Sequence, residues 1–65
     1  MFVVKISSKH FIKTFTTFED ARNFCVDMAA EMRWKNISGT ANDECAMYLM
    51  HDNSGYFYIR INKIS

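Results

Sequence analysis

One segment of this 65-residue chain has the spacing of an amphipathic helix, and the segments around it alternate like strands. From Phe18 onward, apolar side chains recur every three or four residues, which gathers them on one side of a helix. Two threonine–acid pairs can form a capping box at its start, Thr16 with Glu19 or Thr17 with Asp20. We therefore expect one helix from about Phe18 to Lys35, and a sheet that this helix covers.

The segment before the helix has the pattern of a β-hairpin. Residues 2–7 and 10–15 are rich in apolar and β-branched side chains, and Ser8-Lys9 lies between them. A turn at these two residues, or a four-residue loop over residues 7–10, places Phe2 opposite Phe15. One face of the hairpin then carries Phe2, Val4, Ile6, Phe11 and Phe15, and the other carries Val3, Lys5, Ile12 and Thr14.

A second hairpin is expected after the helix. Residues 36–43 are mostly turn formers and predict a loop, and strands follow at residues 45–51 and from residue 56 to about residue 64. If Gly55 is left-handed, a three-residue loop over residues 53–55 places Leu49 opposite Ile59. The residues facing the core are then Met47, Leu49, His51, Phe57, Ile59 and Ile61. A slip of one residue would place Leu49 beside Tyr58 and mix the two faces.

These elements predict a single α+β domain over residues 1–65, with the order β-β-α-β-β. The sheet would have four strands, mainly antiparallel, with the helix packed on one face. Hydrophobic residues make up 49% of the chain, which supplies a core, although so small a domain is only marginally stable alone. Because one helix covers only one side of a sheet, the other side is expected to stay open.

The open side of the expected sheet is the candidate contact surface, because it combines tyrosine, methionine and arginine, which are enriched at protein interfaces. The candidate partner-binding residues are Lys5, Ile12, Tyr48, Met50, Tyr56, Tyr58 and Arg60, together with Trp34 near the helix end. Trp34 could instead fold back over the core. Two alternatives exist for the face itself: a solvated surface of cross-strand pairs, or a platform on which single-stranded bases stack.

Charge limits the class of partner. The formal net charge is +1, with acids and bases interspersed, and the open side offers only Lys5 and Arg60 as cations. The expected helix carries four acids, which would repel phosphates. We therefore expect a protein partner rather than nucleic acid. Homodimerisation through the open side is a further option that would stabilise so small a domain.

The sequence predicts neither a membrane span nor a secretory leader. The N-terminal segment has no basic leader, and no stretch approaches the about 18 apolar residues that a membrane span needs. Two cysteines, Cys25 and Cys45, do not make a disulfide framework. We expect a cytoplasmic protein with both thiols reduced.

The side chains that could carry chemistry form no recognisable motif. His10, Cys25, Cys45 and His51 could in principle bind zinc, but no CxxC or HxxxH pair exists and Cys25 lies on the apolar stripe. Cys45 and His51 are six residues apart on one strand, roughly 20 Å, too far for a nucleophile and its base. We therefore expect no catalytic residue, metal site or cofactor, and do not expect an enzyme.

The sequence thus favours a small protein-binding module. Proline and glutamine are absent, and Ile, Phe, Asn and Lys supply 22 of the 65 residues, a mixture typical of AT-rich coding and of small bacteriophage genes. On this basis we expect a phage-type inhibitor, of the anti-CRISPR kind, that binds and blocks a host defence protein. The rival hypothesis is a nucleic-acid-binding regulator that uses Lys5, Tyr48, Tyr58 and Arg60.

Overall fold

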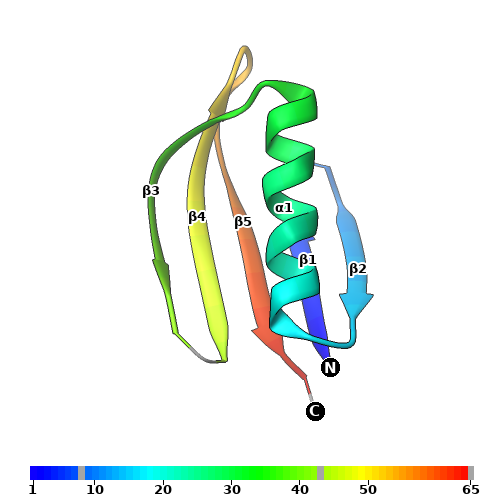
Figure 1. Cartoon of the computed structure of the whole chain (residues 1–65). Coiled ribbons are helices and arrows are strands. Elements are labelled where there is room, and N and C mark those ends of the chain that lie inside the picture. Colours follow the sequence, from blue (N-terminus) through cyan, green and yellow to red (C-terminus); the bar gives the residue numbers. More distant parts are fainter. Residues whose placement is uncertain (8, 43, 65) are drawn as a thin grey trace.

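A computed structural model describes residues 1–7, 9–42 and 44–64 of the chain. One helix packs on one face of an antiparallel sheet, as the sequence predicts, but the sheet has five strands rather than four (Figure 1). In chain order the elements are β1 (Phe2–Ile6), β2 (Phe11–Phe15), α1 (Phe18–Met32), β3 (Lys35–Ala41), β4 (Cys45–Asp52) and β5 (Gly55–Lys63). The order is therefore β-β-α-β-β-β.

The strands lie in the order β2-β1-β5-β4-β3, and every neighbouring pair is antiparallel. The first and last strands of the chain thus pair with each other inside the sheet, and both chain ends lie at the same end of the molecule (Figure 1). The register expected for the first hairpin is confirmed, with Phe2 opposite Phe15 and Ile6 opposite Phe11. Ser8, placed in its turn by the sequence, lies outside the described residues.

The helix ends earlier than its apolar spacing predicts. Thr17 is the N-cap, and its Oγ1 accepts a hydrogen bond from the Asp20 N–H at 3.1 Å. At the other end Arg33 adopts the left-handed conformation, and the Trp34 N–H donates to the Ala29 carbonyl at 2.9 Å. The left-handed Arg33 and the hydrogen bond from Trp34 to Ala29 end the helix in a Schellman motif. The chain then turns back into β3, so the prediction of a helix to Lys35 and of a loop over residues 36–41 is wrong. Asn42 lies between β3 and β4, and Asp43 lies outside the described residues.

The expected register of the second hairpin is also wrong, by one residue. Asp52 pairs with Gly55, so only Asn53 and Ser54 form the tip of the turn. The Asp52 carboxylate accepts hydrogen bonds from the Ser54 hydroxyl at 2.7 Å and the Ser54 N–H at 2.8 Å, which hold the pKa of Asp52 below its usual value. Because of this one-residue change, every side chain of β4 lies on the face opposite to the one predicted. Its residues on the helix side are Ala46, Tyr48 and Met50, and those facing away are Met47, Leu49 and His51.

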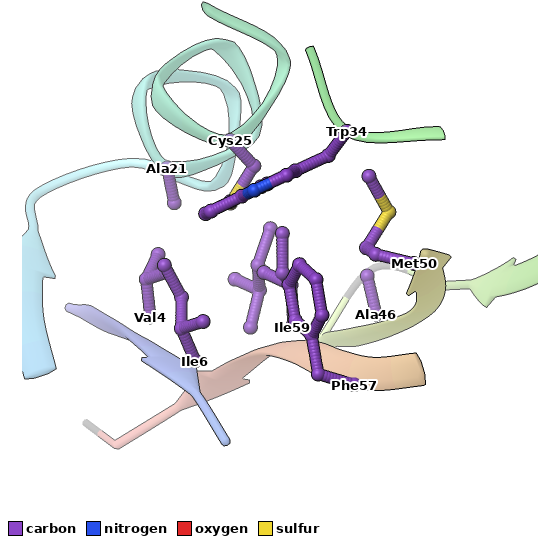
Figure 2. Close-up of a cluster of buried hydrophobic side chains, with 10 residues drawn as sticks. Val4, Ile6, Ala21, Cys25, Trp34, Ala46, Met50, Phe57 and Ile59 are labelled. Carbon is purple, nitrogen blue, oxygen red and sulfur yellow. The ribbon is translucent and has the colours of Figure 1, made fainter. Parts of the chain in front are cut away.

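The core lies between α1 and the middle of the sheet (Figure 2). Its largest fully buried side chains are Val4, Ile59 and Ile61, from the adjacent inner strands β1 and β5. Ala21 and Cys25 meet them from α1, and the indole of Trp34 lies in the same cluster, against Phe57 (Figure 2). The helix contacts β5, β1 and β2, whereas β4 and β3 extend beyond it on one side (Figure 1).

Candidate functional site

The side of the sheet turned away from α1, here called the outer face, is not covered by any described element. Alternation along each strand, with the observed pairing, determines which residues lie there. They are Val3 and Lys5 on β1, Ile12 and Thr14 on β2, Tyr56, Tyr58, Arg60 and Asn62 on β5, Cys45, Met47, Leu49 and His51 on β4, and Lys35, Ser38 and Thr40 on β3.

Large apolar and aromatic groups are exposed on the outer face. Tyr56 is 70% exposed, Ile12 66%, Tyr58 44% and Met47 37%. The ring of Tyr56 lies against that of His51, its cross-strand partner, with the centroids 4.8 Å apart. Single exposed apolar residues are ordinary on protein surfaces, but several on one face mark a candidate interaction site.

The charges on the outer face have one sign. Lys5 stands directly opposite Arg60, and both are exposed. Their other cross-strand neighbours are Ile12 and Met47, so this row contains no acid. Among the outer-face residues named above there is no aspartate or glutamate, while α1 carries Glu19, Asp20, Asp27 and Glu31 on the opposite layer. The described strands therefore present a basic, partly aromatic surface.

A hollow of about 280 Å³ opens on the outer face between β2 and β5. It is lined by Lys5, Ile6, Ser7, His10, Phe11, Ile12, Tyr58 and Arg60. The Tyr58 N–H donates to Ser7 Oγ at 2.9 Å, and the Ser7 N–H donates to the Tyr58 carbonyl at 3.0 Å, which ties β5 to the end of β1. Four of the candidates named from sequence, Lys5, Ile12, Tyr58 and Arg60, thus line one hollow.

Three of the sequence candidates lie elsewhere. Met50 is 3% exposed and Trp34 8%, so both belong to the core, and the Trp34 ring meets Phe57 edge to face at 4.8 Å between centroids. Tyr48 is half-buried on the helix side of β4. Placing Tyr48 and Met50 on the open side was wrong because the register of the second hairpin was wrong. The β4 residues that lie on the outer face instead are Met47, Leu49 and His51. From the sequence, only a two-residue turn at Asn53-Ser54 would have predicted this register.

A second hollow, of about 350 Å³, lies on the helix side where α1 leaves β4 uncovered. It is lined by Arg22, Cys25, Val26, Ala29, Asn36, Tyr48, Met50 and Ile59. Its floor consists of core side chains, and the Asn36 amide points at Met50 Sδ, 3.4 Å away. With Arg22 as the only charged group in its lining, it is better described as the open edge of the helix–sheet interface.

The two cysteines differ in environment. Burial raises the pKa of the Cys25 thiol to about 11, whereas Cys45 is exposed near the end of β4. Among residues 1–7, 9–42 and 44–64, no three His, Cys, Asp or Glu side chains are placed to hold a metal ion. In the same part of the chain, α1 is neither long nor apolar enough to span a membrane.

Comparison with protein-family models, curated proteins and solved structures found no match to this chain.

Proposed function

We propose that the protein is a non-enzymatic module that binds another protein through the outer face of its sheet. The observation that carries the proposal is the exposure of Ile12, Met47, Tyr56 and Tyr58 on one face that also contains Arg60. Tyrosine, methionine and arginine are enriched at interfaces because they combine large contact area with polar groups. Several large exposed apolar groups on one face mark an interaction site.

The size of the face fits this role. The molecule measures 34 × 19 × 18 Å, so its broad side is of the same order as the about 800 Å² that each partner contributes to a stable complex. A partner of standard size would cover most of the sheet. The more specific part of the proposal is that such a complex blocks the partner, as expected of a phage-type inhibitor of a host defence protein acting in the cytoplasm.

A nucleic-acid-binding function is the second candidate. The observation that favours it is Tyr58, which lies on the inner strand β5 close to Lys5 and Arg60, on a face without described acids. Aromatic groups on an open sheet can stack single-stranded bases. Against it stand the aliphatic side chains of Ile12, Met47 and Leu49, which supply no stacking surface.

A capture experiment separates the two candidates. The tagged protein is incubated with a lysate of its native host, with and without nuclease, and the bound material is identified. We expect a stoichiometric protein that survives nuclease treatment and is lost with Tyr58→Ala. The matched control is Met32→Ala, which removes a 49% exposed side chain from α1 and should capture the same protein.

Two outcomes count against protein binding. The first is retention of nucleic acid, with the bound proteins released by nuclease. The second is equal capture by wild type and Tyr58→Ala, provided that thermal unfolding shows the variant to be folded. Steep loss of binding between 50 and 200 mM salt would point to phosphate contacts, because counterions are then released on binding.

A further inference from the structure

Two cations face each other across the middle of the outer face. Lys5 on β1 and Arg60 on β5 are register partners, and these strands have neighbours on both sides. Like charges at directly opposite positions of adjacent strands destabilise a sheet. The next residues in the row, Ile12 on β2 and Met47 on β4, are apolar and offset none of the repulsion. A costly pair at the centre of a proposed interface suggests an anionic ligand.

We propose that Lys5 and Arg60 together bind one carboxylate of an acidic side chain on the partner protein. This inference rests on the proposed function, because it assigns the chemistry of the partner that the outer face binds. A carboxylate between an ammonium and a guanidinium group accepts charge-assisted hydrogen bonds from both. Its attraction to each of the two cations also offsets the repulsion between them.

The hollow on the outer face gives this acidic side chain a partly enclosed position. Lys5 and Arg60 are part of its lining, together with Ser7, His10 and Tyr58. The apolar side chain of Ile12 completes the side toward β2. A carboxylate that enters the hollow leaves bulk water in part, and its attraction to both cations becomes stronger as the local dielectric falls.

The row across the sheet also specifies what lies on either side of the carboxylate. Ile12, Lys5, Arg60 and Met47 occupy four adjacent strands, so the apolar ends are about 14 Å apart at the usual strand spacing. In an extended peptide, side chains four residues apart on the same side are separated by about 13 Å. An extended segment with an acidic residue at its centre and an apolar residue two positions to each side therefore matches the row.

Charge complementarity and the apolar ends together favour such a peptide over a nucleic acid. A phosphate would also meet Lys5 and Arg60, but a nucleic acid carries a charge at every nucleotide and needs further cations along its path. In the row itself the positions beyond the two cations are Ile12 and Met47. They suit apolar side chains and offer nothing to a neighbouring phosphate.

The test uses a labelled nonapeptide of serine and threonine with glutamate at its centre and leucine two positions to each side. A second peptide has glutamine at the centre, and a ten-nucleotide oligothymidylate represents nucleic acid. Binding to the full chain is followed by fluorescence anisotropy. We expect the glutamate peptide to bind at least tenfold more tightly than the glutamine peptide.

Matched variants locate the site. Lys5→Gln and Arg60→Gln should each weaken binding of the glutamate peptide at least tenfold and leave the glutamine peptide unchanged. Lys63→Gln is the control. Lys63 is an exposed cation on β5, the strand of Arg60, but it pairs with Phe2 and lies on the helix side. The Lys63→Gln variant should bind the glutamate peptide with an affinity within twofold of wild type. The melting temperature of Lys5→Gln should equal or exceed that of wild type, since one member of the like-charge pair is neutralised.

Equal affinity for the two peptides, or no peptide binding, overturns the carboxylate site. Tighter binding of oligothymidylate than of the glutamate peptide overturns it as well. The capture experiment tests the proposed function separately, because it asks only whether a protein binds the outer face. A protein partner that is lost with Tyr58→Ala but retained with Lys5→Gln refutes the carboxylate site and leaves protein binding intact.

Discussion

Among single residues, Arg33 is held in a conformation that glycine would adopt more easily. Its φ of 59° and ψ of 36° are left-handed, which costs a non-glycine residue about 1–2 kcal/mol. We predict that Arg33→Gly raises the free energy of unfolding by about 0.5–1 kcal/mol, after the added flexibility of the unfolded chain is subtracted. Urea unfolding measures the change. Arg22→Gly, inside α1, should instead lower stability by about 1 kcal/mol, and equal losses in both variants would refute the strain at Arg33.

The buried thiol of Cys25 makes a prediction about alkaline pH. Its pKa is raised from about 9 to about 11 in the folded protein, so between these values the unfolded chain releases the proton and the folded chain keeps it. Stability should therefore fall as the pH rises from about 9 toward 11. Thermal unfolding over this range should show a shallower decline for Cys25→Ala than for wild type. An equally steep decline in the variant would mean that other groups cause it.

At the scale of elements, β3 is a segment whose structure is determined by pairing with another strand and not by its local sequence pattern. Ser38, Gly39, Thr40 and Asn42 are turn formers and predict a loop, and Arg33 gives no helix stop signal because glycine is the usual residue at that position. Pairing with β4 decides the outcome instead. Gly39 is required in this strand for a steric reason, since a Cβ there would lie 2.6 Å from Cδ1 of the Tyr48 ring.

This close approach predicts the effect of Gly39→Ala. The added methyl group has to displace the Tyr48 ring, which packs against the core, and overpacking of this kind costs about 1–3 kcal/mol. Chemical denaturation should report that loss. Ser38→Ala, one residue earlier on the outer face, should change stability by no more than about 0.5 kcal/mol. A Gly39→Ala protein as stable as wild type would show that the ring moves away without cost.

The two hairpins differ in how much their sequences reveal. In the first, the faces contrast clearly, and the predicted register is the observed one. In the second, both alternating sets on β4 contain large apolar residues, Met47 and Leu49 in one and Tyr48 and Met50 in the other. Hydrophobicity could not choose between them, so the prediction depended on whether the turn has two or three residues. Lys5 and Ile12 were placed correctly because their hairpin does not involve that turn. Tyr58 and Arg60 were placed correctly because they alternate with the buried residues of β5, whatever the turn length.

For the whole molecule, the cations on the outer face and the acids on α1 determine how two copies can associate. A homodimer through the outer face would bring Lys5 and Arg60 of one copy toward the same cations of the other, since an isologous interface repeats the same patch on both sides. We therefore predict that the wild-type protein is monomeric at 50 mM salt and associates more strongly at 500 mM, where repulsion is screened. Lys5→Glu should reverse this dependence, because it makes the central pair complementary between copies. Sedimentation velocity at both salt concentrations measures the change, and a wild-type dimer that weakens as salt increases would contradict it.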